Sequence, residues 1–111
     1  MAAASVTGRV WFTGAKIIQA IKFHLVNEGW FETVPDGLTE WLRKEIRANK
    51  KISVKKSDWE ETRSGTQRML WLMVASSIDP YECCKWAQSP GDAKAMHQRF
   101  TNIIQSWGDS D

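Results

Sequence analysis

The sequence predicts an all-α protein, a compact single domain of about five helices with no convincing sheet. The chain has 111 residues, the size of one domain, and its 42% of hydrophobic and 25% of charged residues are typical of a globular protein. Its apolar residues recur mostly with the 3.6-residue period of a helix. Ile52-Ser53-Val54 alternates and could be a short extended piece, but it is too short to establish a sheet. We therefore expect a loose N-terminal segment over residues 1–12, a helical domain over residues 13–108 and a frayed acidic tail over residues 109–111.

The first two helices are expected over residues 13–28 and 37–50. Thr13 is the expected N-cap of the first, and Gly29 suits the left-handed position that follows a last helical turn. The apolar face of the first helix consists of Ile17, Ile18, Ile21 and Leu25. Asp36 is the expected cap of the second helix. One face of that helix is apolar, with Leu38, Trp41, Leu42 and Ile46.

A third helix is expected from Ser57 to about Ser77. Ser57 and Glu60 have the spacing of a capping box, in which each side chain binds a free backbone amide of the other residue. The dipeptide Ser64-Gly65 inside this helix would allow a kink.

Two further helices are expected towards the C-terminus. A short one follows the cap Asp79, with proline at its first position, where a missing amide does no harm. The last helix begins in the same way after Ser89 and closes at Gly108. Its apolar stripe is the clearest in the chain and consists of Ala93, Met96, Phe100, Ile103, Ile104 and Trp107.

The charge of the chain is concentrated in one segment. Residues 43–56 carry a net charge of +6 and the rest of the chain −4, although the whole chain carries only +2. Helices that use charge for solubility usually mix the two signs at i,i+4 spacing, whereas this segment holds one acid, Glu45. Its basic residues are Arg43, Lys44, Arg47, Lys50, Lys51, Lys55 and Lys56. On a helical wheel the first five lie opposite the apolar face of the second expected helix, and Lys55 and Lys56 follow beyond its end. The alternative is a solvated lysine-rich face that contacts nothing.

This clustering of positive charge predicts a module that binds an anionic polymer or surface, and nucleic acid is the first candidate. In a helix-turn-helix arrangement the next helix would enter the major groove, but it begins with Asp58, Glu60 and Glu61, which would be repelled by phosphates. We therefore expect contact with the phosphate backbone and little readout of base sequence.

A second hypothesis is a protein-interaction module or a small oligomer. It rests on large apolar residues beyond those that the helix faces need, Phe23, Val26, Trp30 and Phe31. Core packing is the simplest role for most of the seven tryptophans. Trp11 and the Trp30-Phe31 pair fall in connectors, so either could instead be an exposed aromatic for base stacking or partner binding.

The sequence carries no catalytic motif, and we expect no enzyme, no cofactor, no metal site and no small-molecule substrate. Cys83 and Cys84 are adjacent and are the two cysteines of the chain, so a disulfide within it would need a strained geometry. Free thiols indicate a reducing compartment, the cytoplasm or the nucleus. The start of the chain lacks the features of a signal peptide, and no apolar run is long enough to span a membrane, so we expect a protein that is not secreted.

A short stretch of the sequence resembles lentiviral matrix domains. The matching residues are Asn27-Glu28-Gly29-Trp30-Phe31-Glu32-Thr33, followed by Gly37 and Leu42. The resemblance implies a viral five-helix domain of similar length whose basic surface binds acidic membrane lipids and can bind RNA. Ala2 stands where many members of that family have an acylated glycine, and the basic cluster lies in the middle of the chain, not near its start.

Overall fold

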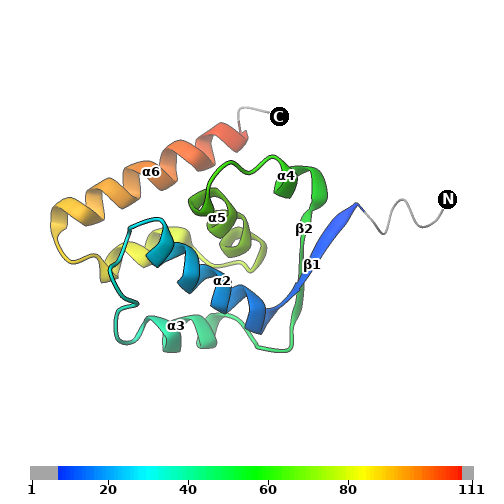
Figure 1. Cartoon of the computed structure of the whole chain (residues 1–111), viewed down its shortest axis with the longest axis horizontal. Coiled ribbons are helices and arrows are strands. Elements are labelled where there is room, and N and C mark those ends of the chain that lie inside the picture. Colours follow the sequence, from blue (N-terminus) through cyan, green and yellow to red (C-terminus); the bar gives the residue numbers. More distant parts are fainter. Residues whose placement is uncertain (1–7, 109–111) are drawn as a thin grey trace.

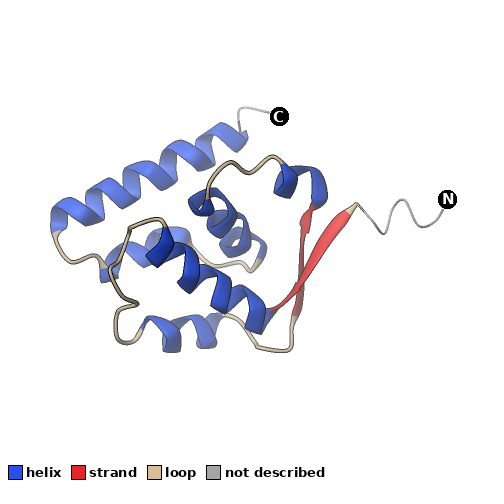
Figure 2. Ribbon diagram, viewed as in Figure 1, coloured by secondary structure: helices blue, strands red, loops and turns tan. Residues whose placement is uncertain are grey.

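The structure is a computed structural model, and it describes residues 8–108. Helices enclose the core, and two strands lie along one side of the molecule, away from the first half of α6 (Figures 1 and 2). In chain order the elements are β1 (Arg9–Thr13), α2 (Gly14–Asn27), α3 (Leu38–Glu45), β2 (Lys51–Lys55), α4 (Lys56–Glu60), α5 (Gly65–Ala75), the 3₁₀ helix η1 (Pro80–Trp86) and α6 (Pro90–Gly108).

The prediction of an all-α fold without a sheet is wrong, because β1 and β2 pair as a two-stranded antiparallel sheet. In its register Arg9 lies opposite Lys55, and Thr13 lies opposite Lys51. Residues 9–12, which we expected in a loose segment, therefore form most of β1. The expectations for residues 1–7 and for the acidic tail lie outside the described residues.

The core lies between α2 and α5, which pack against each other, and α3, η1 and α6 close it. Phe100 of α6 is the largest side chain that is completely buried. The sheet contributes Ile52 and Val54, both buried, to the same core. The helices contribute most of the other buried residues, among them Ile17, Ile21, Leu25, Leu38, Leu42, Met69, Leu70, Leu72, Met73 and Met96.

The helix expected over residues 37–50 is shorter in the structure. α3 ends at Glu45, because Ile46 adopts an extended backbone with φ −126° and ψ 117°. Ile46 is still 1% exposed, so it packs in the core as its place in the apolar pattern predicts. The remainder of the expected helix forms a loop that leads into β2 at Lys51.

The long helix expected from Ser57 is two helices, α4 and α5. α4 begins at Lys56 without a side-chain cap, so the predicted capping box at Ser57 is wrong. Ser64 caps α5 instead, and its hydroxyl accepts a hydrogen bond from the amide of Gln67 at 3.2 Å. The expected kink at Ser64-Gly65 is thus a complete break.

The cap expected at Asp36 is wrong, because the residue before α3 is Gly37, with φ 90°, and no side chain caps this helix. Three of the expected helix starts are confirmed. The side chains of Thr13, Asp79 and Ser89 each accept a hydrogen bond from an amide in the first turn that follows. Gly29 has the left-handed backbone expected after the first helix, with φ 83°.

Candidate nucleic-acid interface

The register of the sheet sorts its side chains onto two faces. Residues directly opposite one another in an antiparallel pair project from the same face. Ile52 and Val54 point into the core, so their partners Phe12 and Val10 share the inner face. The opposite face, which we call the outer sheet face, consists of Arg9, Trp11, Thr13, Lys51, Ser53 and Lys55. This face is cationic, and it also carries a large aromatic ring.

Arg9 is a functional candidate that the sequence reasoning missed. Its guanidinium donates hydrogen bonds to the side-chain hydroxyl and to the backbone carbonyl of Ser53 on the other strand. Lys55 lies directly opposite Arg9 in the register. Strand pairing therefore adds a cation from the start of the chain to the basic segment. The one signal in the sequence was the run Val10-Trp11-Phe12-Thr13, whose β-branched and aromatic residues favour strands.

The loop between α3 and β2 carries two more cations, Arg47 and Lys50, and the start of α2 holds it in place. The Gly14 amide donates to the carbonyl of Lys50 at 2.7 Å, and the Ala15 amide donates to that of Ala48 at 2.9 Å. A methyl group on Gly14 would lie 1.8 Å from the carbonyl oxygen of Arg47. Only glycine lets the loop approach the helix start so closely. The amides at the start of α2 thus fix the path of this loop.

The predicted basic residues are all exposed, but the five that were expected on one helix face do not share it. Arg43 and Lys44 lie on α3, Arg47 and Lys50 in the loop, Lys51 and Lys55 on β2, and Lys56 at the start of α4. The helical-wheel argument failed because α3 ends before Arg47.

Most of these cations have no carboxylate partner. In residues 8–108 the structure has two ion pairs, Arg43 with Glu40 at 3.0 Å and Lys85 with Glu82. Arg43 is therefore partly neutralised. Among the cations without a carboxylate partner in this part of the chain, we call those on the sheet, in the loop between α3 and β2 and at the start of α4 the cationic strip: Arg9, Arg47, Lys50, Lys51, Lys55 and Lys56. The strip follows the loop and both ends of the sheet. Because a five-residue strand spans about 17 Å, the two ends of the sheet are about that far apart.

The four apolar residues of the alternative interaction surface separate in the structure. Phe23 is 60% exposed and Val26 37% exposed, and both line a shallow groove of about 390 Å³ beside α2. Phe31, by contrast, is 3% exposed and belongs to the core. Trp30 is half-buried, and its indole N–H donates to the Thr66 hydroxyl at 3.0 Å. The prediction of one exposed surface with four members is therefore wrong for Phe31, and Trp30 is only partly exposed.

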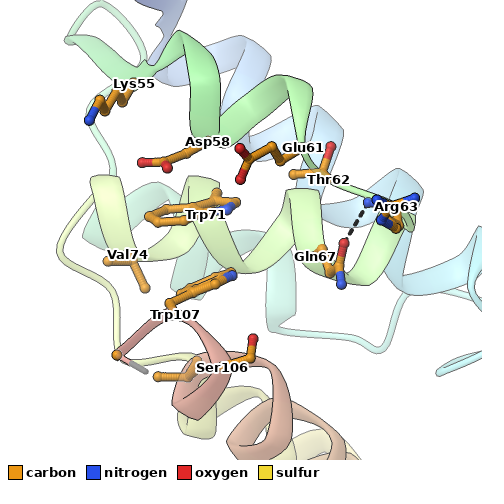
Figure 3. A pocket seen from close by; sticks show the side chains of 12 residues that line it. Lys55, Asp58, Glu61, Thr62, Arg63, Gln67, Trp71, Val74, Ser106 and Trp107 are labelled. Carbon is orange, nitrogen blue, oxygen red and sulfur yellow. Dashed lines mark hydrogen bonds between the residues drawn. The ribbon is translucent and has the colours of Figure 1, made fainter. Parts of the chain in front are cut away.

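The largest hollow, about 720 Å³, lies between α4, α5 and the end of α6 (Figure 3). Trp71 and Trp107 stack at its base, with ring centroids 3.9 Å apart. Two carboxylates, Asp58 and Glu61, and two cations, Lys55 and Arg63, stand around the rings. Equal numbers of both signs give this hollow no preference for an anionic ligand.

The thiols are poor nucleophiles. Burial raises the pKa of Cys83 to about 12, and the neighbouring Cys84 adds to this increase. Burial also raises the pKa of Cys84, with a further contribution from Asp79. His97 of α6 lies against the ring of Tyr81 of η1, with ring centroids 4.4 Å apart. Residues 8–108 contain no group of three or more His, Cys, Asp or Glu residues that could hold a metal ion.

Comparisons of the chain with protein-family models, with curated proteins and with solved structures found no match. Within residues 8–108, none of the helices has both the length and the apolar character needed to cross a membrane.

Proposed function

We propose that the chain is a non-enzymatic module that binds the phosphate backbone of nucleic acid through the cationic strip. The observation that carries this proposal is the strand register, which groups Arg9, Lys51 and Lys55 on one exposed face next to the loop cations. Unpaired cations attract phosphates strongly, because each contact releases condensed counterions from the nucleic acid. The free thiols of Cys83 and Cys84 favour a reducing compartment, the cytoplasm or the nucleus.

The kind of cation favours contact with phosphates over base readout. Four of the six members of the strip are lysines, which bind phosphate as point charges and have no fixed hydrogen-bonding fork. Sequence is usually read by bidentate side chains on a helix or a two-stranded ribbon that enters a groove, but the one arginine on the outer sheet face, Arg9, has its guanidinium bound to Ser53. The module should therefore bind many sequences with similar affinity.

A matched pair of charge reversals tests the proposal. Lys51→Glu with Lys55→Glu reverses two cations of the strip, and Lys94→Glu with Arg99→Glu makes the same charge change on α6. Titrating both variants with fluorescent single-stranded and duplex oligonucleotides should show a loss of at least about tenfold for the first pair and little change for the second. If the first pair binds every oligonucleotide like the unaltered chain, the proposal is wrong.

Acidic membranes are the other anionic partner that the resemblance to lentiviral matrix domains suggests. Vesicles with and without phosphatidylserine belong in the same binding scan, with the same two variants. Binding to acidic vesicles but to no oligonucleotide would show that the strip binds acidic membranes and not nucleic acid.

A protein-interaction function is the second candidate, and the exposure of Phe23 and Val26 favours it. Both side chains lie on one stretch of α2, beside the groove that Val34 also lines. An exposed apolar patch of this kind is typical of an interface between proteins. Light scattering on the purified chain tests self-association: a concentration-dependent dimer that Phe23→Ser dissociates supports this function, and a strict monomer counts against self-association.

A further inference from the structure

Trp11 differs from the other tryptophans in its environment. The side chain is 57% exposed, although tryptophan is usually mostly buried. In residues 8–108, Trp11 makes no ring contact, whereas each of the other tryptophans packs against a second aromatic ring. These pairs are Trp30 with Phe100, Trp41 with Trp86, Trp59 with Phe12, and Trp71 with Trp107. Core packing therefore explains the other tryptophans and does not explain Trp11.

The neighbours of Trp11 on the outer sheet face are polar and cationic. Ser53 lies directly opposite, so Lys51 and Lys55 are its two diagonal neighbours on β2. Diagonal neighbours in an antiparallel pair lie about 7–8 Å apart, within reach of long side chains. Arg9 stands two positions before Trp11 on the same strand, and its guanidinium is held by Ser53. An exposed indole thus lies between cations on both sides along the strands.

We propose that Trp11 stacks on an unpaired base of single-stranded nucleic acid while Arg9, Lys51 and Lys55 bind the flanking phosphates. This inference rests on the proposed function and names its ligand more narrowly. Proteins that bind single strands without sequence preference combine a basic track with aromatic rings on which the bases stack. A base in a duplex is already stacked on its neighbours and offers no free face, so this site selects a single strand.

The surroundings of Trp11 favour a base over a lipid surface. A tryptophan that enters a membrane interface normally belongs to an apolar face that enters with it. Here the other apolar residues of the sheet share the opposite face, and Phe12, Ile52 and Val54 pack in or against the core. The residues beside Trp11 are charged or carry hydroxyl groups, which suits a base framed by phosphates.

The experiment compares two single-stranded oligonucleotides of equal length, one of thymidines and one of abasic nucleotides. Both have the same phosphates, but only the first has bases to stack. The unaltered chain should bind the thymidine strand about tenfold more tightly, the effect of one stacked base. Trp11→Ala should remove this difference and leave the abasic strand bound as before, and Trp11→Phe should keep most of it.

Phe23→Ala is the matched control, because Phe23 is an equally exposed aromatic on α2, outside the strip. It should leave both affinities unchanged. Circular dichroism and the melting temperature establish that each variant folds, and truncation of an exposed ring should not disturb either.

The outcomes separate this inference from the proposed function. If the unaltered chain binds neither strand but binds a duplex, the inference fails and the proposed function stands; if it binds no oligonucleotide at all, both fail. If the chain binds both strands equally, or Trp11→Ala binds like the unaltered chain, the base-stacking site is refuted while phosphate binding stands. If Trp11→Ala weakens binding to acidic vesicles but not to the thymidine strand, Trp11 is a membrane contact and the inference is overturned.

Discussion

Replacing Lys51 and Lys55 by alanine should make nucleic-acid binding less sensitive to salt by a predictable amount. For single strands, log K falls with log salt at about −0.7 for each neutralised phosphate. The cationic strip has six members, of which four to six can reach one bound strand, so the unaltered chain should have a slope of about −3 to −4. Affinity would then fall about 100-fold between 50 and 200 mM salt.

The double variant Lys51→Ala with Lys55→Ala removes two of these contacts. Its slope should therefore be shallower by about 1.4. The assay is fluorescence anisotropy of a labelled oligothymidine at five or six salt concentrations, with the slope fitted for each variant. A slope is a better readout than one affinity, because a variant that merely misfolds in part loses binding without changing its salt dependence.

Lys94→Ala with Arg99→Ala is the control, since it removes the same charge from α6. If electrostatic attraction by the whole chain dominated binding, both double variants would change the slope equally. That result, or an unchanged slope for the variant of the strip, would refute direct phosphate contact by Lys51 and Lys55.

Three further predictions concern stability and reactivity. Gly14→Ala should lower the free energy of unfolding by about 2 to 3 kcal/mol in urea titrations, because its methyl group collides with the Arg47 carbonyl; Gly91→Ala, whose nearest contact would be 3.8 Å away, should be neutral. Cys83 should resist iodoacetamide at about pH 8 until the chain unfolds, because burial raises its pKa to about 12; rapid labelling of the folded chain, read by mass spectrometry, would contradict this. Burial lowers the pKa of His24 below its ordinary value of 6.5, against the opposing effect of Glu28, so the unfolded state binds this proton more readily. The stability that His24 contributes should be present above about pH 6.5 and decline as the pH falls below it, and urea titrations of His24→Gln should show a weaker decline.

Local chemistry made three of the five expected helix starts predictable, and non-local pairing hid the sheet. The caps at Thr13, Asp79 and Ser89 follow from a side chain and an amide a few residues away, which the sequence shows directly. The strands Arg9–Thr13 and Lys51–Lys55 are each five residues long, and each is too short to be recognised alone. They are stable as a pair, but α2 and α3 separate them in the chain.

It was easier to predict which residues are buried than to predict the secondary structure in which they lie. The position of Ile46 in the apolar pattern correctly places it in the core, yet the residue is extended and ends α3. The same pattern extended the helix past Arg47, so the cations were assigned to one helix face. Their composition pointed to an anion-binding surface, but the addition of Arg9 and the position of Trp11 needed the strand register.

The most direct test of the central claim maps the binding site on the folded chain. Amide chemical shifts of the isotope-labelled protein are followed by NMR as a short single-stranded oligonucleotide is added. We expect changes concentrated in β1, the α3–β2 loop and β2, with the indole N–H of Trp11 among the largest and α6 unaffected. Changes centred on Phe23 and Val26, or spread along α6 with the sheet unaffected, would contradict this expectation.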